Sequence, residues 1–399
     1  MQYIFITPWY GNFAGGFEVL VRRYAEYLAA AGYDVAVLTT CSKDPYSKWD
    51  KDDYSEDESI INKVKVHRFS TNKGQLDKFH AAIVASQHDF TPDLSSQYDF
   101  FLYGIASNNL LNYIEKIDIN AKIICGPYFH SLAYHVLKKY PNRIYLWPAL
   151  HDEPQLQWQP VGDMLSYAKN IFLATEEEKD LAIAYYGRKI GRKIIEAPVI
   201  GIPIEVPGDL ESKSVLASKY KLPEKYFVYV GRKELGKNVG LLTEWYQKYI
   251  DGLNNDSAMV PPLVFIGGGE ANLVPADKNY IDLGYISEQD KYSLIANATA
   301  LINLSLNESF SFVMMEAWLC NTPVIVHYNC EVTKNHCLKS SGGYVVKNFS
   351  DFKLALSQLS FGRESNSMAA AGREYVTKNY SCSKVISDFI LALNYENID

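Results

Sequence analysis

The sequence lacks the features that mark several broad classes of protein. None of its six cysteines stands in a CxxC pair and the first ten residues do not form a secretory signal, so we expect free thiols in a reducing cytoplasm rather than a disulfide framework. No apolar run approaches the roughly 20 residues that span a bilayer, which predicts a soluble or peripheral protein. An excess of positive charge is also missing: the formal net charge is -7, which argues against a nucleic-acid partner.

What the chain does contain is enough apolar sequence for two cores. Of its 399 residues, 48% are hydrophobic and 14% aromatic, so we expect two globular domains. Prolines and glycines interrupt the stretch after Ala197, which places the hinge there. The interrupting residues are Pro198, Gly201, Pro203, Pro207 and Gly208. We predict a first domain of residues 1–200 and a second of residues 201–378.

Short apolar strands alternate with amphipathic helices from the start of the chain. A strand over 3–7, a helix over 17–31 and a strand over 34–39 predict a βαβ unit, and Gly15 and Gly16 before its helix let the backbone approach a ligand closely. Further strand signals are found at 64–69, 99–103, 122–125 and 143–147. This alternation predicts an α/β fold.

The central stretch, residues 300–326, reads as a strand, an acidic turn, a helix over 312–320 and a second strand. Such a strand-to-helix turn directs backbone N–H groups and the positive end of a helix at whatever lies beyond the strand, which suits an anion. Glu308 falls in the turn and Glu316 about one helical turn inside, so both carboxylates can border one pocket.

A second turn supplies positive charge. The strand beginning at Phe227 runs into Gly231, and Arg232, Lys233 and Lys237 follow. Arginine offers a planar fork and lysine a point charge, and such cations beside an anion site are what a diphosphate needs.

Other ionisable groups have weaker signals. His151, followed by Asp152 and Glu153, lies at the end of a predicted strand, where an open α/β sheet has its ligand-binding crevice. A histidine there can hydrogen-bond a ligand or a developing charge. His130 and His135 are the alternatives for this role. Residues 175–178, Thr-Glu-Glu-Glu, form a capping box whose acidic run we expect to be solvated. Basic residues over 188–193 alternate with isoleucines, and they either cover a surface or meet acidic lipid headgroups.

Residues 308–318 followed by Asn-Thr-Pro-Val-Ile-Val resemble the E-x7-E signature of the retaining family-4 glycosyltransferases of GT-B fold. The opening residues 5–40 and the run from Gly231 to Lys237 are similar to the same family. This resemblance implies two Rossmann-like domains facing across a cleft, with the C-terminal helix, residues 379–399 in our division, crossing back to the first domain. Ser311, in place of the usual glycine, and the phrase His-Asp-Glu-Pro at 151–154 resemble a bacterial polysaccharide-building subset.

The resemblance also assigns roles to residues. It places Glu308 beside the donor sugar, Glu316 on the nucleotide ribose and Arg232 with Lys237 on the diphosphate. It implies that the catalytic residues are Glu308, His151, Arg232 and Lys237. The donor-binding residues that it implies are Gly15, Gly16, Arg232, Lys237, Tyr285, Glu308, Ser309, Phe310, Ser311, Phe312 and Glu316.

The function implied is metal-independent transfer of a hexosyl unit from a UDP- or GDP-sugar, without a further cofactor. The acceptor expected is a saccharide or a lipid-linked saccharide in cell-surface polysaccharide synthesis, which would bring a cytoplasmic enzyme to the inner face of the membrane. Two other interpretations stay open: a nucleotide-sugar epimerase of the same fold, and a non-catalytic carbohydrate-binding or scaffold subunit.

Overall fold

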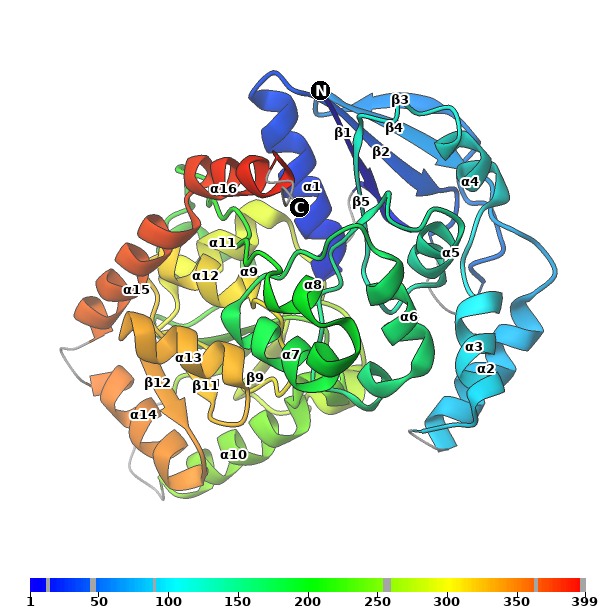
Figure 1. Ribbon diagram of the computed structural model, residues 1–399. Helices are drawn as coiled ribbons and strands as arrows, with labels where there is room; N and C mark the ends of the chain where they lie inside the picture. The colour runs from blue at the N-terminus through cyan, green and yellow to red at the C-terminus, as the bar shows by residue number, and fades with distance from the viewer. Residues whose placement is uncertain (12–14, 44–47, 89–90, 254–259, 362–364, 395–399) are drawn as a thin grey trace. The chain divides into compact units, whose positions relative to one another are not determined.

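The structure is a computed structural model that describes residues 1–11, 15–43, 48–88, 91–253, 260–361 and 365–394 (Figure 1). The chain divides into two compact units. The first domain consists of Met1–Pro203 and Ser383–Asp399, and the second domain of Ile204–Cys382. In the described part of the chain, no helix combines the length and the apolarity needed to cross a membrane.

The first domain is built on a sheet with the strand order β3-β4-β2-β1-β5-β6. Neighbouring strands are parallel except for β3 and β4, which pair antiparallel at one edge. The strands are β1 Gln2–Ile6, β2 Asp34–Thr40, β3 Glu58–Ile61, β4 Val64–Phe69, β5 Lys122–Cys125 and β6 Tyr145–Leu146. The inner strands β1, β2 and β5 are buried along nearly their whole length, as expected for a parallel sheet covered on both faces.

The helices of this domain are α1 Gly16–Ala30, α2 Leu76–His88, α3 Leu94–Tyr103, α4 Asn108–Ile114, α5 Ser131–Lys139, α6 Gln159–Tyr167, α7 Glu176–Ile190 and α8 Arg192–Ile195, with a 3-10 turn at Pro154–Gln157. The predicted cap of α7 is confirmed, since the Thr175 hydroxyl accepts a hydrogen bond from the Glu178 N–H at 3.1 Å. The expectation that the acidic run is solvated is wrong for Glu178, which is 1% exposed.

The strand predicted at 99–103 is also wrong, because these residues form the end of α3. Asp93 caps this helix by accepting a hydrogen bond from the Ser96 N–H at 3.1 Å. The four apolar residues after Asp99 fit a strand or one face of a helix equally well, and the cap lies outside this run.

The second domain repeats the parallel arrangement with the strand order β12-β11-β10-β7-β8-β9. The strands are β7 Phe227–Val230, β8 Leu263–Ile266, β9 Tyr280–Asp282, β10 Ala300–Asn303, β11 Val324–His327 and β12 Gly343–Val346. The helices are α9 Lys213–Tyr220, α10 Val239–Asp251, α11 Glu288–Asn297, α12 Phe312–Leu319, α13 Glu331–Ser340, α14 Phe349–Phe361 and α15 Ser365–Tyr380, with 3-10 turns η2 Leu235–Lys237 and η3 Ala271–Leu273. Since β7 lies between β10 and β8, the turns that follow these three strands are neighbours.

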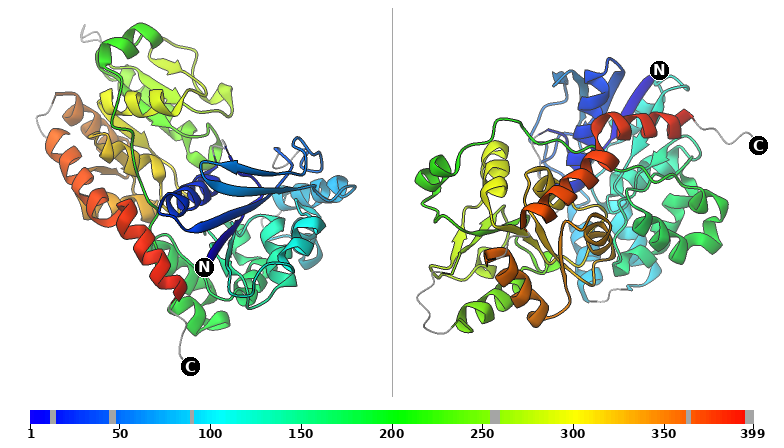
Figure 2. Two further views of the ribbon diagram at one scale, coloured as in Figure 1. Left: turned by 90° about the horizontal axis from the view of Figure 1, so that it is seen from above. Right: turned by 90° about the vertical axis from the view of Figure 1, so that its left-hand side faces the viewer.

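The C-terminal helix α16, Cys382–Asn394, follows α15 directly and belongs to the first domain (Figure 2). Its Phe389 is fully buried, with its ring centroid 4.8 Å from that of Tyr24 and 6.1 Å from those of Phe5 and Trp147. This aromatic packing confirms the predicted return of the chain to the first domain.

Candidate functional site

The turns at the carboxyl ends of β7 and β8 touch through their backbones. Gly231 and Gly267 both have positive φ, +153° and +123°. A Cβ atom on Gly267 would lie 2.3 Å from the Gly231 carbonyl oxygen, so a side chain has no room there. The two glycines therefore let these turns pack against each other beside β10.

The structure brings Lys237 and Glu308 together. Lys237 ends the turn η2 after β7, Glu308 lies in the loop after β10, and the lysine Nζ is 2.9 Å from the Glu308 Oε1. The side chains are 25% and 14% exposed, so this ion pair is partly shielded from solvent but reachable. Asn238, in the left-handed conformation, donates from Nδ2 to the Leu304 carbonyl at 3.1 Å and joins the same two loops.

Arg232 and Lys233, neighbours in sequence, have different surroundings. Arg232 is 57% exposed and its Nη2 lies 3.2 Å from Glu234 Oε1. The Lys233 side chain is 4% exposed, and its Nζ donates to Asp282 at 2.7 and 2.9 Å and to the Gly267 carbonyl at 2.8 Å. Lys233 thus joins the turns after β7 and β8 to the end of β9. Of these two neighbours, Arg232 is the cation that a ligand can reach.

Helix α12 begins directly after the loop that carries Glu308. Ser311 precedes its first residue with φ 68°, and the Asn303 Nδ2 donates to the Ser311 hydroxyl at 3.1 Å. Phe310 is buried, with its ring packed against those of Phe312 and Tyr380. Helix α12 therefore begins at Phe312, the residue at which the sequence predicts it, directly after the turn that we predict as an anion site.

Glu316 lies one turn inside α12 and is 2% exposed. Its Oε1 accepts a hydrogen bond from the Tyr292 hydroxyl at 3.1 Å, and its Oε2 lies 3.2 Å from the Lys291 Nζ. The nearby Cys320 thiol has its pKa raised to about 12, first by burial and then by the charge of Glu316. Lys291 and Tyr292 are not among the residues predicted from the sequence, because no local signal connects α11 with α12.

Tyr285 follows β9 and is 71% exposed. Its ring lies against Gly268, where an added Cβ atom would come within 2.3 Å of it. A cavity of about 460 Å³ also lies at the β9 edge, and its lining includes Tyr280 and Asp282 but none of the predicted site residues. Tyr285 is thus an exposed aromatic ring beside the turns of β8 and β9.

The glycines predicted in the first domain lie at the start of α1. Gly15 is the N-cap of this helix and Gly16 its first residue. A Cβ atom on Gly15 would lie 1.9 Å from the Glu18 Oε2, whereas one on Gly16 would meet nothing within 4 Å. Residues 12–14, which precede these glycines, lie outside the described residues.

The predicted histidines differ in environment. His151 is partly buried in the loop after β6. This loop is anchored by the buried Glu178, whose two carboxylate oxygens accept hydrogen bonds from the Leu150 and Ala174 N–H groups, each at 2.6 Å. His130 packs edge-on against Trp9, with ring centroids 4.9 Å apart, and burial lowers its pKa to about 4.

The second domain gathers cations and carboxylates around the turns that follow β7 and β10. Lys237, Arg232 and the start of α12 supply positive charge, and Glu308 and Glu316 supply carboxylates. In the part of the chain that the structure describes, no group of three or more His, Cys, Asp or Glu residues is placed to hold a metal ion.

The second domain resembles a known protein family. Residues 224–360 match the model of the family described as "Glycosyl transferases group 1". No curated protein sequence matches the chain.

Solved structures resemble the whole chain. Trehalose-6-phosphate synthase OtsA superposes with a TM-score of 0.76 at 13% identity, covering 99% of both chains. Sucrose-phosphate synthase from Thermosynechococcus elongatus gives 0.70 at 16% identity with 98% of both chains covered. TarM from S. aureus, in a complex with UDP, gives 0.68 at 11% identity and covers 98% of this chain and 99% of its own. At these identities the likeness shows the fold, and the predicted GT-B fold is confirmed.

Proposed function

We propose that this chain of GT-B fold, with a group 1 glycosyltransferase domain at residues 224–360, is a retaining glycosyltransferase. It moves a hexosyl unit from a UDP- or GDP-sugar to a saccharide or lipid-linked saccharide acceptor in cell-surface polysaccharide synthesis. The observation that carries the proposal is the contact of Lys237 with Glu308 at the start of α12. In the proposal, the lysine is the cation for the leaving diphosphate, and the carboxylate beside it serves the sugar that the diphosphate leaves.

In the proposed reaction, the bond between the anomeric carbon and the diphosphate breaks. Negative charge then gathers on the diphosphate, and Lys237, Arg232 and the N-terminus of α12 stabilise it. These groups supply the positive charge that a metal ion supplies in other enzymes. The acceptor attacks from the face that the diphosphate leaves, which retains the configuration.

The carboxylates have separate tasks in this scheme. Glu308 lies beside the donor sugar and balances the positive charge that develops on its ring. Glu316 accepts hydrogen bonds from the ribose. His151, on the loop held by Glu178, is the proposed histidine of the acceptor-side domain.

The proposed acceptor brings the protein to the inner face of the membrane. Of the four basic residues over 188–193, Lys193 donates to the carbonyls of Ser166 and Ala168, and Arg192 pairs with Glu196. Arg188 and Lys189 are exposed and are the proposed contacts with acidic headgroups.

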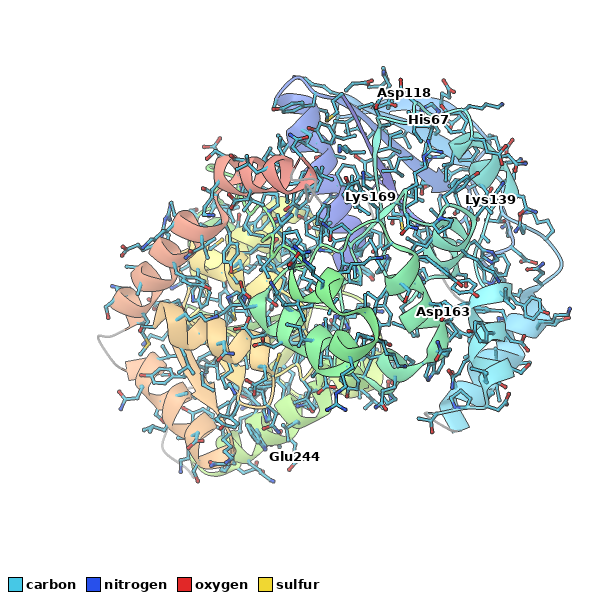
Figure 3. All side chains as sticks on the ribbon, in the orientation of Figure 1. His67, Asp118, Lys139, Asp163, Lys169 and Glu244 are labelled. Atoms are coloured by element: carbon cyan, nitrogen blue, oxygen red, sulfur yellow. The ribbon has the colours of Figure 1, made fainter. Side chains whose placement is uncertain are left out.

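Thermal unfolding with UDP, GDP and ADP at matched concentration tests the donor site. We expect UDP or GDP to stabilise the wild type, by about 2.7 kcal/mol at 100 times its dissociation constant, and Glu316→Ala to lose this stabilisation. The matched control is Glu244→Ala on the exposed surface of α10, whose side chain is labelled in Figure 3. If no nucleotide raises the unfolding temperature of the wild type, the donor-site assignment is wrong.

The nucleotide that binds then sets the assay of the reaction. The protein is incubated with sugar conjugates of that nucleotide, with and without saccharide acceptors. The anomeric configuration of the product is determined by NMR. We expect donor consumption to depend on the acceptor. Conversion of the donor to an epimeric sugar nucleotide without an acceptor would establish the epimerase interpretation instead.

A further inference from the structure

Two consecutive residues of α11 hold the two oxygens of the Glu316 carboxylate. The Tyr292 hydroxyl donates to Oε1 at 3.1 Å, and the Lys291 Nζ lies 3.2 Å from Oε2. The terminal torsion of a glutamate is broad and carries little preference of its own. Contacts from α11 therefore set the orientation of this carboxylate.

Burial makes this arrangement strong. The side chains of Glu316 and Lys291 are 3% and 14% exposed, and Tyr292 is 5% exposed. At low exposure an ion pair is poorly screened, and removal of one partner leaves a buried charge without compensation.

A fourth residue, Glu288, also contacts this network. Its two oxygens each lie 3.2 Å from the Lys291 Nζ, and one lies 3.3 Å from the Tyr292 hydroxyl. A phenol has one proton to donate, and Glu316 is the nearer acceptor for Tyr292. Glu288 is 57% exposed and is bound by Lys291, so the Tyr292 hydroxyl donates its proton to Glu316.

Resting on the proposed function, in which Glu316 binds the nucleotide ribose, we propose that Lys291 and Tyr292 are positioning residues for this contact. They hold the carboxylate so that its two oxygens accept from the 2′- and 3′-hydroxyls together. Lys291 thereby determines the discrimination between ribonucleoside and 2′-deoxyribonucleoside diphosphates.

Removal of Lys291 changes the preference for ribose because it changes the freedom of the Glu316 carboxylate. With the carboxylate fixed, loss of the 2′-hydroxyl removes one hydrogen bond to a charged acceptor, and the carboxylate cannot turn to recover it from the 3′-hydroxyl. Without Lys291 the carboxylate can turn, so that a single ribose hydroxyl finds an acceptor oxygen in more than one orientation. The preference for ribose then shrinks, even where the affinity for the nucleotide falls only modestly.

Isothermal titration with UDP, 2′-deoxy-UDP, GDP and 2′-deoxy-GDP tests the proposal. We expect the wild type to bind the ribose form of its nucleotide about tenfold or more tightly than the deoxyribose form, the value of a hydrogen bond to a charged acceptor. In Lys291→Met this ratio should fall to about threefold or less, and Lys291→Arg, which keeps the charge, should retain most of it. Tyr292→Phe removes one hydroxyl alone and should lower the ratio to an intermediate value.

The matched control is Lys219→Met. Lys219 also pairs with a carboxylate of α11, Asp290 at 2.7 Å, but it does not contact Glu316. The ratio of affinities for the ribose and deoxyribose forms should be the same in Lys219→Met as in the wild type. A folded Lys291→Met or Tyr292→Phe protein with an unchanged ratio would overturn this inference alone, whereas a wild type that binds none of the four nucleotides would overturn the proposed function and this inference with it.

Discussion

At the scale of single residues, Lys237 is the side chain on which the proposed chemistry depends most. Its Nζ lies 2.9 Å from Glu308 in a turn fixed by Asn238. We expect Lys237→Ala to lose at least about 2 kcal/mol of transition-state stabilisation, roughly 30-fold in kcat/KM, because the charge-assisted bond strengthens as the diphosphate leaves. Steady-state kinetics with the identified donor measure the loss.

The control for this variant is Lys248→Ala. Lys248 pairs with Glu244 one turn along α10 at 2.6 Å, and both side chains are more than half exposed, so its removal should leave kcat/KM unchanged. Turnover of Lys237→Ala within threefold of the wild type would exclude Lys237 as a catalytic residue.

At the scale of secondary-structure elements, helix α16 is held to the first domain by a buried face formed by Val385, Phe389 and Leu393, of which Phe389 is the aromatic member. Phe389 is fully buried among rings that include Phe5, Tyr24 and Trp147. We expect Phe389→Ala to lower the free energy of unfolding of the first domain by about 3–5 kcal/mol, because it leaves a cavity between helix and sheet. Urea denaturation followed by circular dichroism measures this change.

The same helix offers its own control. Leu391 is 64% exposed, and Leu391→Ala should change the free energy of unfolding by no more than about 0.5 kcal/mol. Equal effects of the two substitutions would mean that α16 does not pack as the structure has it.

At the scale of the whole molecule, the pH dependence of stability reports a carboxyl group that the fold has buried. Burial raises the pKa of Glu178 to about 8, against the opposing effect of hydrogen bonds from the Ala174 and Leu150 N–H groups. A raised pKa means that the folded state holds the proton more tightly than the unfolded state, so this contribution to stability is complete below about pH 4.5 and is lost as the pH rises through about 8. His130, with its pKa lowered, acts in the opposite direction only below about pH 6.5.

We therefore expect the unfolding temperature of the first domain to fall between about pH 6.5 and pH 8.5 in the wild type, and to fall less in Glu178→Gln. Differential scanning calorimetry over this range measures both slopes. Glu176→Gln, an exposed substitution in the same helical turn, should keep the wild-type slope. Parallel slopes for wild type and Glu178→Gln would show that Glu178 does not titrate in this window.

The sequence by itself determined what depends on neighbours along the chain. The turn between β10 and α12, the cap of α7 at Thr175 and the alternation of strands and helices follow from turn chemistry and apolar periodicity, which act over a few residues. The alternation of strands and helices was also sufficient to predict α/β domains with parallel sheets. The prediction was wrong at residues 99–103, because a short apolar run there is compatible with the periodicity of a strand and with that of a helix.

Only the tertiary structure decided which separated residues meet. Lys237 and Glu308, Lys233 and Asp282, and Lys291 and Glu316 come together because β7 inserts between β10 and β8 and because α11 packs beside α12. Strand order and helix packing depend on how a whole sheet buries its faces, and no local pattern encodes that choice. For the same reason Glu178 reads as a solvated residue in the sequence, and becomes a buried anchor only once the loop ahead of His151 folds over it.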